Sequence, residues 1–250
     1  MTDQVMMDVQ GLEIRFGGVV AAAGINFQIY EGRNLAIIGP NGAGKTTFLN
    51  MCTGYLKPHA GKIIYEGEDV AGIGPRKLVK KGVARAFQIP QLFAEHSVRE
   101  NILMAVAAAS GYEAPLTRLE DISGASEADR ILEMLKCSNL AERPVQELPE
   151  GQRKLIDIGV ALALKPRLLF LDEPTSGVAS TEKFAILEII AEALEEENVT
   201  SVFVEHDEGI VERFADEVAV WNRGEVLYRG TPQDILTHPD VIRDVMGGHV

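Results

Sequence analysis

Residues 39–47 read Gly39-Pro40-Asn41-Gly42-Ala43-Gly44-Lys45-Thr46-Thr47. They follow a short apolar run, residues 35–38, and precede a helix-like segment that starts near Phe48. A strand, a glycine-rich loop and a helix in this order are the context of a phosphate-binding loop, because backbone N–H groups surround the phosphates and the helix dipole favours an anion. Lys45 would then reach the β- and γ-phosphates, and the Thr46 hydroxyl would hold Mg²⁺. The alternative is a glycine-rich turn that binds nothing, but the order of elements predicts a nucleoside triphosphate site.

The composition is that of a globular protein, since 46% of the 250 residues are hydrophobic and 24% are charged. No apolar run approaches the roughly 18–20 residues that cross a bilayer. The best candidate, residues 155–164, is too short and contains Asp157. No signal peptide is visible, and Cys52 and Cys137 are far apart in helix-like sequence, which argues against a disulfide framework. We therefore predict a cytoplasmic protein.

The net charge of −13 argues against nucleic acid as a partner, because such binding calls for a basic face. It also disfavours direct adhesion to an anionic membrane leaflet, so any membrane association would run through another protein. The alternative is that the acidity serves solubility alone. We expect no nucleic-acid partner.

Strand-like and helix-like segments alternate along the chain, which predicts an α/β fold with a mainly parallel sheet. The expected strands are residues 8–16, 25–30, 35–38, 62–65, 83–88, 168–171 and 201–204, followed by a hairpin over 217–228. The expected helices are residues 155–164, residues 184–197 and a segment that starts at Ile210. The first two strands add antiparallel β-structure, and the helix-rich region 97–137 is the expected separate lobe.

Two acids, Asp172 and Glu173, follow an apolar strand at the edge where open parallel sheets bind ligands. Neighbouring strand residues point to opposite sides, so the two acids are not expected to do the same job. We expect Asp172 to hold Mg²⁺ through a water molecule, and Glu173 to orient or deprotonate the water that attacks the γ-phosphate. A strand that ends in two acids is common, and it is the upstream phosphate-binding loop that favours this interpretation.

Two further polar residues follow expected strands. His206 should emerge at the same sheet edge, where an imidazole could contact the γ-phosphate and align the water. Gln88 precedes a proline-containing loop, and its amide could contact the metal or the water without changing the charge of the site. The alternatives are ordinary ones, because a lone histidine is usually structural or exposed and a loop glutamine is usually solvated.

Five segments together occur in the order and spacing of an ABC ATPase. They are residues 39–47, Phe87-Gln88, residues 148–152 (Leu-Pro-Glu-Gly-Gln), residues 168–173 (Leu-Leu-Phe-Leu-Asp-Glu) and His206. Over essentially its whole length the chain resembles the ATP-binding subunit of an ABC transporter. The resemblance implies a P-loop NTPase fold with a mainly parallel core sheet in a single domain, residues 1–250. It also implies a helical lobe near residues 95–155 and antiparallel β-structure near residues 5–32 and 60–70.

The same resemblance implies the roles of individual residues and, as cofactors, ATP and Mg²⁺. ATP would be bound by Phe16, which stacks on adenine, and by Asn41, Gly42, Gly44, Lys45, Thr46 and Thr47. The catalytic residues would be Glu173, His206 and Gln88. The residues that hold the metal would be Thr46, Gln88 and Asp172. The signature loop, which acts on the ATP of a second subunit, would be Leu148, Pro149, Glu150, Gly151 and Gln152. Without the resemblance, Phe16 would be assigned to the core or to an edge strand.

Two residues depart from the family pattern. The signature loop usually carries a serine where this chain has Pro149, which offers neither a hydroxyl nor an N–H. The contact across the dimer would then come from Gly151 and the start of the following helix. At Ala179 the family usually has an acid or an amide. Both changes could lower turnover, or make this chain the less active member of a heterodimer.

Within the family, the chain most resembles the branched-chain amino acid uptake ATPases. The matching segments are residues 14–19, 86–93, 204–207, 230–235 and 238–243. Uptake ATPases for urea and amides, and an export ATPase for lipopolysaccharide, share much of this pattern. A soluble ABC-type ATPase, such as that of iron–sulfur cluster assembly, is an alternative from another class.

The resemblance also implies partners and a location. It predicts a homodimer, or a heterodimer with a second ABC ATPase subunit, bound to transmembrane permease subunits. A periplasmic or extracellular solute-binding protein would act with them indirectly. The chain would be cytoplasmic and peripheral, held at the inner face of the cell membrane by the permease.

Overall fold

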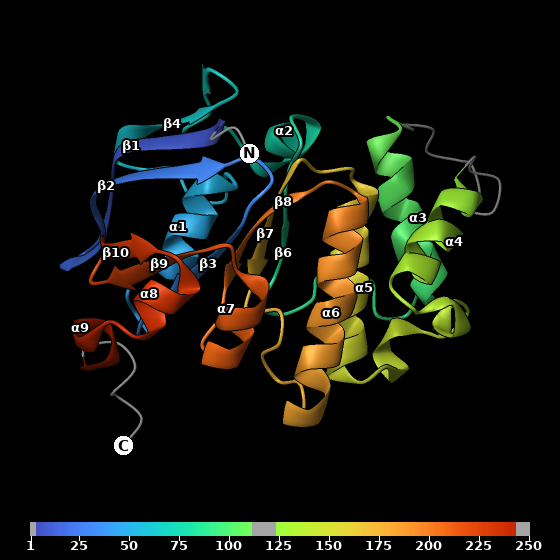
Figure 1. Cartoon of the computed structure of the whole chain (residues 1–250). Coiled ribbons are helices and arrows are strands. Elements are labelled where there is room, and N and C mark those ends of the chain that lie inside the picture. The colour runs from blue at the N-terminus through green and yellow to red at the C-terminus, as the bar shows by residue number, and fades with distance from the viewer. Residues whose placement is uncertain (1–3, 112–123, 244–250) are drawn as a thin grey trace. The chain divides into compact units, whose positions relative to one another are not determined.

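The computed structural model describes residues 4–111 and 124–243, and these residues confirm the predicted α/β class (Figure 1). Two compact units can be distinguished along the chain. The first unit comprises Met1–Leu78 and Thr200–Val250, and the second comprises Val79–Val199.

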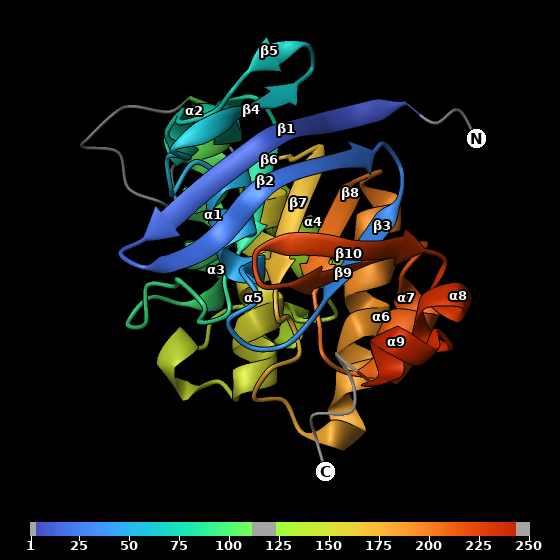
Figure 2. The same cartoon turned by 90° about the vertical axis from the view of Figure 1, so that its left-hand side faces the viewer.

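The first unit contains an antiparallel sheet with the strand order β2-β1-β4-β5 (Figure 2). The strands are β1 (Val5–Phe16), β2 (Val19–Tyr30), β4 (Ala60–Tyr65) and β5 (Glu68–Asp69). In the register of this sheet, Val9 of β1 lies opposite Phe27 of β2 and Ile63 of β4, and all three side chains are buried. The alternating sequence therefore buries one face of the sheet.

A second set of strands in the first unit leads to the glycine-rich loop. Strand β3 (Asn34–Ile38) runs parallel to both β8 (Thr200–Val204) and β9 (Glu217–Asn222). Strand β10 (Glu225–Gly230) completes the set by pairing with β9 in the antiparallel direction. All five residues of β8 are buried, as expected for a parallel strand that is covered on both faces.

Three aromatic side chains form the centre of the first unit. Trp221 of β9 packs against Phe27 of β2 and against Phe48 of α1 (Lys45–Cys52), with ring centroids 5.3 Å and 4.8 Å apart. Phe27 and Phe48 meet edge to face at 5.9 Å. Aromatic pairs with this geometry stabilise a core beyond the area that they bury. The cluster joins both sets of strands to the helix that follows the glycine-rich loop.

The second unit pairs two parallel strands with a group of helices. Strand β6 (Val83–Ala86) runs parallel to β7 (Leu168–Asp172), with Ala86 opposite Leu171. The main helices are α3 (Val98–Ala109), α4 (Ala125–Met134), α5 (Glu150–Ala163) and α6 (Ser180–Glu196). Helix α3 begins with a capping box, in which Ser97 Oγ accepts from the Glu100 N–H and the Glu100 carboxylate accepts from the Ser97 N–H.

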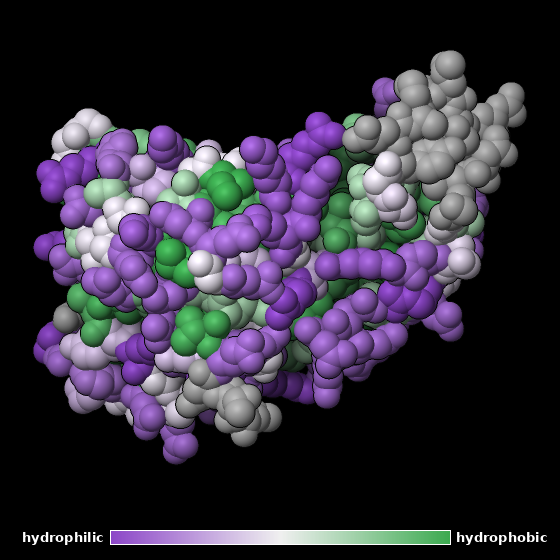
Figure 3. Space-filling view, turned by 90° about the horizontal axis from the view of Figure 1, so that it is seen from above, coloured by the Kyte–Doolittle hydropathy of each residue, from purple (hydrophilic) through white to green (hydrophobic). Residues whose placement is uncertain are grey.

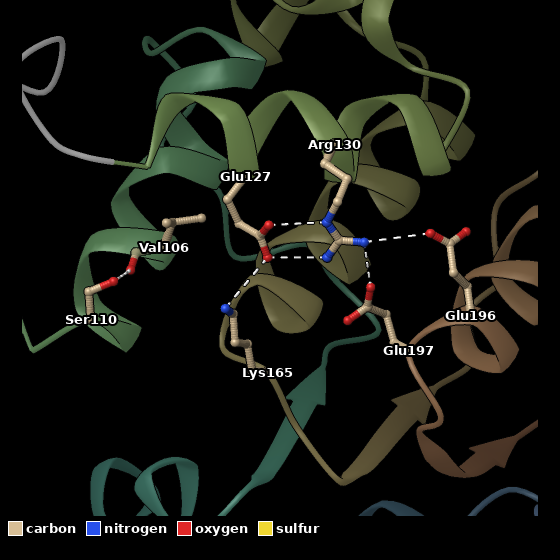
Figure 4. Close-up of polar contacts among 7 residues, drawn as sticks. All are labelled: Val106, Ser110, Glu127, Arg130, Lys165, Glu196 and Glu197. Atoms are coloured by element: carbon tan, nitrogen blue, oxygen red, sulfur yellow. Dashed lines mark hydrogen bonds and ion pairs between the residues drawn. The ribbon is translucent and has the colours of Figure 1, made fainter.

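Ion pairs connect α4 to the end of α6 within the second unit (Figure 4). Arg130 contacts the carboxylates of Glu127 at 3.0 Å, Glu197 at 2.6 Å and Glu196 at 3.6 Å. The hydrogen bonds from Arg130 lower the pKa of Glu127. The Arg130 side chain is 39% exposed, so these ion pairs add little to the stability of the second unit.

Several element boundaries differ from those predicted. Helix α5 begins at Glu150 rather than residue 155, because Pro149, with φ −59° and ψ 158°, has the extended backbone conformation typical of the residue before a first helical turn. Helix α6 likewise begins at Ser180 rather than residue 184, and the strand predicted over 83–88 ends at Ala86.

Most of the elements that were not predicted from the sequence are short helices. The structure adds α2 (Pro75–Lys80), α8 (Pro232–Leu236), α9 (Pro239–Val241) and two 3₁₀ helices, Ser138–Leu140 and Val145–Glu147. Part of the predicted lobe, residues 112–123, lies outside the described residues.

The face of the protein seen in Figure 3 is mainly hydrophilic, with apolar side chains gathered in small separate patches. Within residues 4–111 and 124–243, no helix is both long and apolar enough to cross a membrane.

Candidate nucleotide-binding and catalytic site

The loop between β3 and α1 carries most of the residues predicted to bind phosphates. Lys45, the first residue of α1, is only 6% exposed. Its Nζ donates to the carbonyl oxygens of Gly39 at 2.6 Å and of Pro40 at 3.0 Å. These contacts hold the positive charge against the loop backbone. Thr46, the next residue, is exposed at the start of the helix.

Gly44 determines how the loop enters α1. Its φ of 101° is disfavoured for residues with a side chain, and a Cβ would lie 2.3 Å from the carbonyl oxygen of Ala21. As the residue before the first turn, Gly44 also supplies no side-chain cap to the N–H groups of α1. Such N–H groups, next to a lysine and a threonine hydroxyl, are the donor set that phosphates require. The loop therefore fits the phosphate groups of a nucleotide.

We expect Gly44→Ala to lower the free energy of unfolding by roughly 2–3 kcal/mol, because the methyl group meets backbone and the φ angle becomes strained. Gly42→Ala is the matched control, since Gly42 also has a positive φ (80°) but has no heavy atom within 4 Å of a built Cβ. It should lower stability by about 1 kcal/mol. Urea denaturation without nucleotide measures both variants, and equal losses would contradict the predicted close contact.

The structure brings His206 to the same strand edge of the first unit as the phosphate loop. Because β3 and β8 are parallel, with Ile37 opposite Val204, both strands end at one edge. The Glu205 N–H donates to the Ile37 carbonyl oxygen at 3.4 Å, and His206 follows with an exposed side chain. The predicted position of His206 at this edge is therefore observed.

Phe16 ends β1 and has a side chain that is 49% exposed. It lies opposite Val19 at the end of the β1–β2 hairpin. Ala21, two residues beyond Val19, is the residue whose carbonyl oxygen approaches Gly44. The hairpin end thus lies near the start of α1, and Phe16 is not part of the core.

In the second unit, the parallel strands β6 and β7 bring Gln88 and Glu173 together. The Gln88 amide Nε2 donates to Glu173 Oε2 at 2.8 Å. The two acids differ in surroundings, because Asp172 is 2% exposed whereas Glu173 is only partly buried. Asp172 instead accepts a hydrogen bond of 2.5 Å from Arg85 Nη2, in an ion pair that is almost completely buried.

The predicted signature loop is only partly a loop. Leu148 is buried and Pro149 is exposed, but Glu150, Gly151 and Gln152 already form the first turn of α5. Gly151 packs closely, since a Cβ there would lie 2.6 Å from Ile186 Cδ1. Pro149 precedes the helix without a side-chain cap, so the first N–H groups of α5 have no side-chain acceptor there.

Three charged residues near Gln88 and Glu173 have roles that the sequence did not predict. Arg85 pairs with Asp172, while Lys154 and Asp157 of α5 contact the backbone around Gln88. The sequence signal that could have indicated a role is a charged residue inside an apolar helix, because a buried charge requires hydrogen-bonding partners. Asp157 was noted only because it interrupts the apolar run.

The donor set also fits Mg²⁺. Among the described residues, no group of three or more histidines, cysteines or acids could hold a metal alone. Mg²⁺ in nucleotide sites takes one or two protein ligands and relies on phosphate oxygens, so the exposed Thr46 hydroxyl on a phosphate loop suits it.

The fold and the loop define a P-loop nucleotide-binding protein of the α/β class. The ABC transporter family matches residues 22–176. The chain belongs to this family, as its sequence resemblance predicted, and it binds ATP, hydrolyses it and uses Mg²⁺.

Relatives match over nearly the full length. The chain is 36% identical over 249 residues to the high-affinity branched-chain amino acid transport ATP-binding protein BraF of Pseudomonas aeruginosa, covering 97% of this chain and 98% of BraF. It is 35% identical to the corresponding protein LivG of Escherichia coli, covering 98% of each. Among solved structures, the ADP conformation of MJ1267, an ATP-binding cassette of an ABC transporter, matches with a TM-score of 0.83 and 31% identity, covering 98% of this chain and 99% of MJ1267.

Proposed function

We propose that this chain is the ATP-hydrolysing subunit of an ABC transporter that takes up branched-chain amino acids. The observation that carries the proposal is the near full-length similarity to two ATP-binding proteins of branched-chain amino acid transport, BraF and LivG. It is supported by two arrangements, each within one unit: in the first unit Lys45 is held against the phosphate loop, and in the second unit Gln88 and Glu173 are hydrogen-bonded.

The first unit binds the nucleotide in this proposal. Lys45 neutralises the β- and γ-phosphates, while the loop N–H groups donate to their oxygens. The Thr46 hydroxyl holds Mg²⁺, which when bound neutralises charge that develops on the phosphates. Phe16, which is half exposed, stacks on adenine. The loop residues that complete this set are Asn41, Gly42, Gly44 and Thr47.

The second unit supplies the acid–base chemistry. Glu173 accepts a proton from the attacking water, and Gln88 orients its carboxylate through the hydrogen bond of 2.8 Å. Asp172 would help to hold Mg²⁺ through water, and the buried ion pair with Arg85 fixes the position of its carboxylate. His206, from the first unit, contacts the γ-phosphate.

We further propose that two such subunits act as a pair on the cytoplasmic face of the membrane, bound to permease subunits. The start of α5 (Leu148, Pro149, Glu150, Gly151 and Gln152) would contact the nucleotide of the other subunit through helix N–H groups. The loop after β6 exposes two large apolar side chains, Ile89 at 74% and Phe93 at 60%. Exposed apolar side chains of this kind suit contact with the permease.

The test is uptake in the organism that encodes the chain. Deleting the gene should remove high-affinity uptake of radiolabelled leucine, isoleucine and valine. The wild-type gene should restore it, and a Glu173→Gln gene should not. Uptake of urea, amides and an unrelated sugar provides the specificity controls. Normal leucine uptake in the deletion strain, together with loss of urea or amide uptake, would overturn the assignment of the substrate.

A further inference from the structure

Helix α5 carries two charged side chains that are almost completely buried. Lys154 is 3% exposed and Asp157 is 5% exposed. They lie three positions apart, so they project from the same face of the helix. Burying a charge is unfavourable unless it is well hydrogen-bonded. The hydrogen-bond partners of Lys154 and Asp157 therefore show which segments this face of the helix contacts.

Lys154 connects the two segments that carry the Gln88–Glu173 pair. Its Nζ donates to the carbonyl oxygen of Gln88 at 3.0 Å and to that of Glu173 at 2.7 Å. The side chains of the same two residues meet at 2.8 Å. One ammonium group thus holds the backbones, while the amide and the carboxylate hold each other.

Asp157 binds the backbone of the segment after β6 at two positions, one on each side of Gln88. Its Oδ2 accepts from the Phe87 N–H at 3.0 Å, and its Oδ1 accepts from the Gln91 N–H at 2.9 Å. The pKa of Asp157 is raised, because the effect of burial exceeds the opposing effects of these two N–H groups and of the charge of Lys154. Residues 87–91 are therefore fixed to α5 on both sides of Gln88.

Glu173 needs such support because of its backbone. Its φ is 50°, a left-handed conformation that is uncommon for a residue with a side chain. Backbone strain of this kind persists only when the surroundings fix it, and it is typical of functional sites. The hydrogen bond from Lys154 to the Glu173 carbonyl oxygen is one such constraint.

We propose that Lys154, held in place with Asp157, is a positioning residue for ATP hydrolysis, because it sets the backbone of Glu173 so that its carboxylate meets Gln88. Helix α5 begins directly after Pro149, so the same lysine connects the start of that helix to the Gln88–Glu173 pair. A shift of the helix start would move Lys154 and therefore the carboxylate. The inference rests on the proposed role of Glu173 as the base.

The test compares hydrolysis with ATP binding in the purified full-length chain. Lys154→Met removes the donors and keeps the length of the stem. It should lower kcat about 100-fold, as expected for a carboxylate displaced by a fraction of an ångström to an ångström. The dissociation constant for ATP, measured by equilibrium dialysis, should stay within about twofold, since a group that acts only in the transition state does not alter binding. The control is Lys165→Met, which removes the same charge from a side chain that is 68% exposed and should leave both values unchanged.

A second, milder variant tests the same proposal if Lys154→Met fails to fold. Asp157→Asn keeps the size of the side chain but places an NH₂ group against one of the two N–H donors, and it should lower kcat about tenfold. All rates are measured well below each variant's melting temperature and are expressed per molecule of ATP-binding protein. Rates within about threefold of wild type for both variants would overturn the proposal.

A combined variant separates positioning from a purely structural role. Adding Lys154→Met to Glu173→Gln should not lower the residual rate further, because the lysine acts through that carboxylate. A further drop of the same 100-fold size would show an independent effect and would overturn the inference. If Glu173→Gln alone hydrolyses ATP normally, the assignment of the base fails instead, so the two failures can be distinguished.

Discussion

Glu173→Gln is expected to lower the rate of ATP hydrolysis about 1,000-fold, which is within the usual contribution of a general base. An amide cannot accept the proton from the attacking water. Its oxygen can still accept the hydrogen bond that Gln88 donates at 2.8 Å, so the local geometry should survive. ATP binding should be unchanged, because the substitution leaves Lys45 and the phosphate loop intact and a group that acts only in the transition state does not alter binding.

Phosphate release at saturating ATP and Mg²⁺ measures the rate, and equilibrium dialysis with labelled ATP measures binding. Glu192→Gln on α6 is the matched control, since its side chain is 62% exposed and it should hydrolyse ATP like the wild type. Turnover of Glu173→Gln within about tenfold of the wild-type rate would exclude this carboxylate as the base.

Arg85→Met is expected to lower the free energy of unfolding by about 3–5 kcal/mol, the usual loss when one member of a buried ion pair is removed. Arg85 and Asp172 are only 4% and 2% exposed, and their contact measures 2.5 Å. The guanidinium also lies 4.9 Å from the centre of the Phe87 ring. Its removal would leave the Asp172 carboxylate buried without this cation.

The double variant Arg85→Met/Asp172→Leu should recover most of the lost stability, because it removes both charges together. Arg143→Met is the control, since Arg143 is 48% exposed and should change stability by less than about 0.5 kcal/mol. Urea denaturation followed by circular dichroism measures all three. A loss for Arg85→Met no larger than that of the control would contradict the buried pair.

The glycine-rich loop and the apolar strands around it were predictable because their signals are local. Residues 35–38 and 202–204 are continuous apolar runs, and both lie in buried parallel strands. Asp172 and Glu173 also lie where the sequence places them, at the end of β7. The local sequence pattern was therefore sufficient to predict the α/β class and the positions of these site residues at the ends of strands.

Contacts between distant positions were not predictable in this way. Arg85 pairs with Asp172 across 87 residues, and Lys154 reaches Gln88 across 66. Only the fold brings these groups together. The start of α5 was misplaced for a different reason. Proline and glycine at 149–151 are typical of a loop, yet Pro149 has the extended backbone conformation that precedes a helix.

The aromatic cluster of the first unit has a consequence for spectroscopy. Trp221 is the only tryptophan in the chain, it is fully buried, and its carbonyl oxygen lies 2.1 Å from the place that a Cβ on Gly39 would occupy. Fluorescence that is excited selectively from tryptophan therefore reports only on the core of the first unit, next to the start of the phosphate loop. A melting curve recorded by this emission follows the first unit, whereas far-ultraviolet ellipticity follows both. Any difference between the two curves would measure how independently the second unit unfolds.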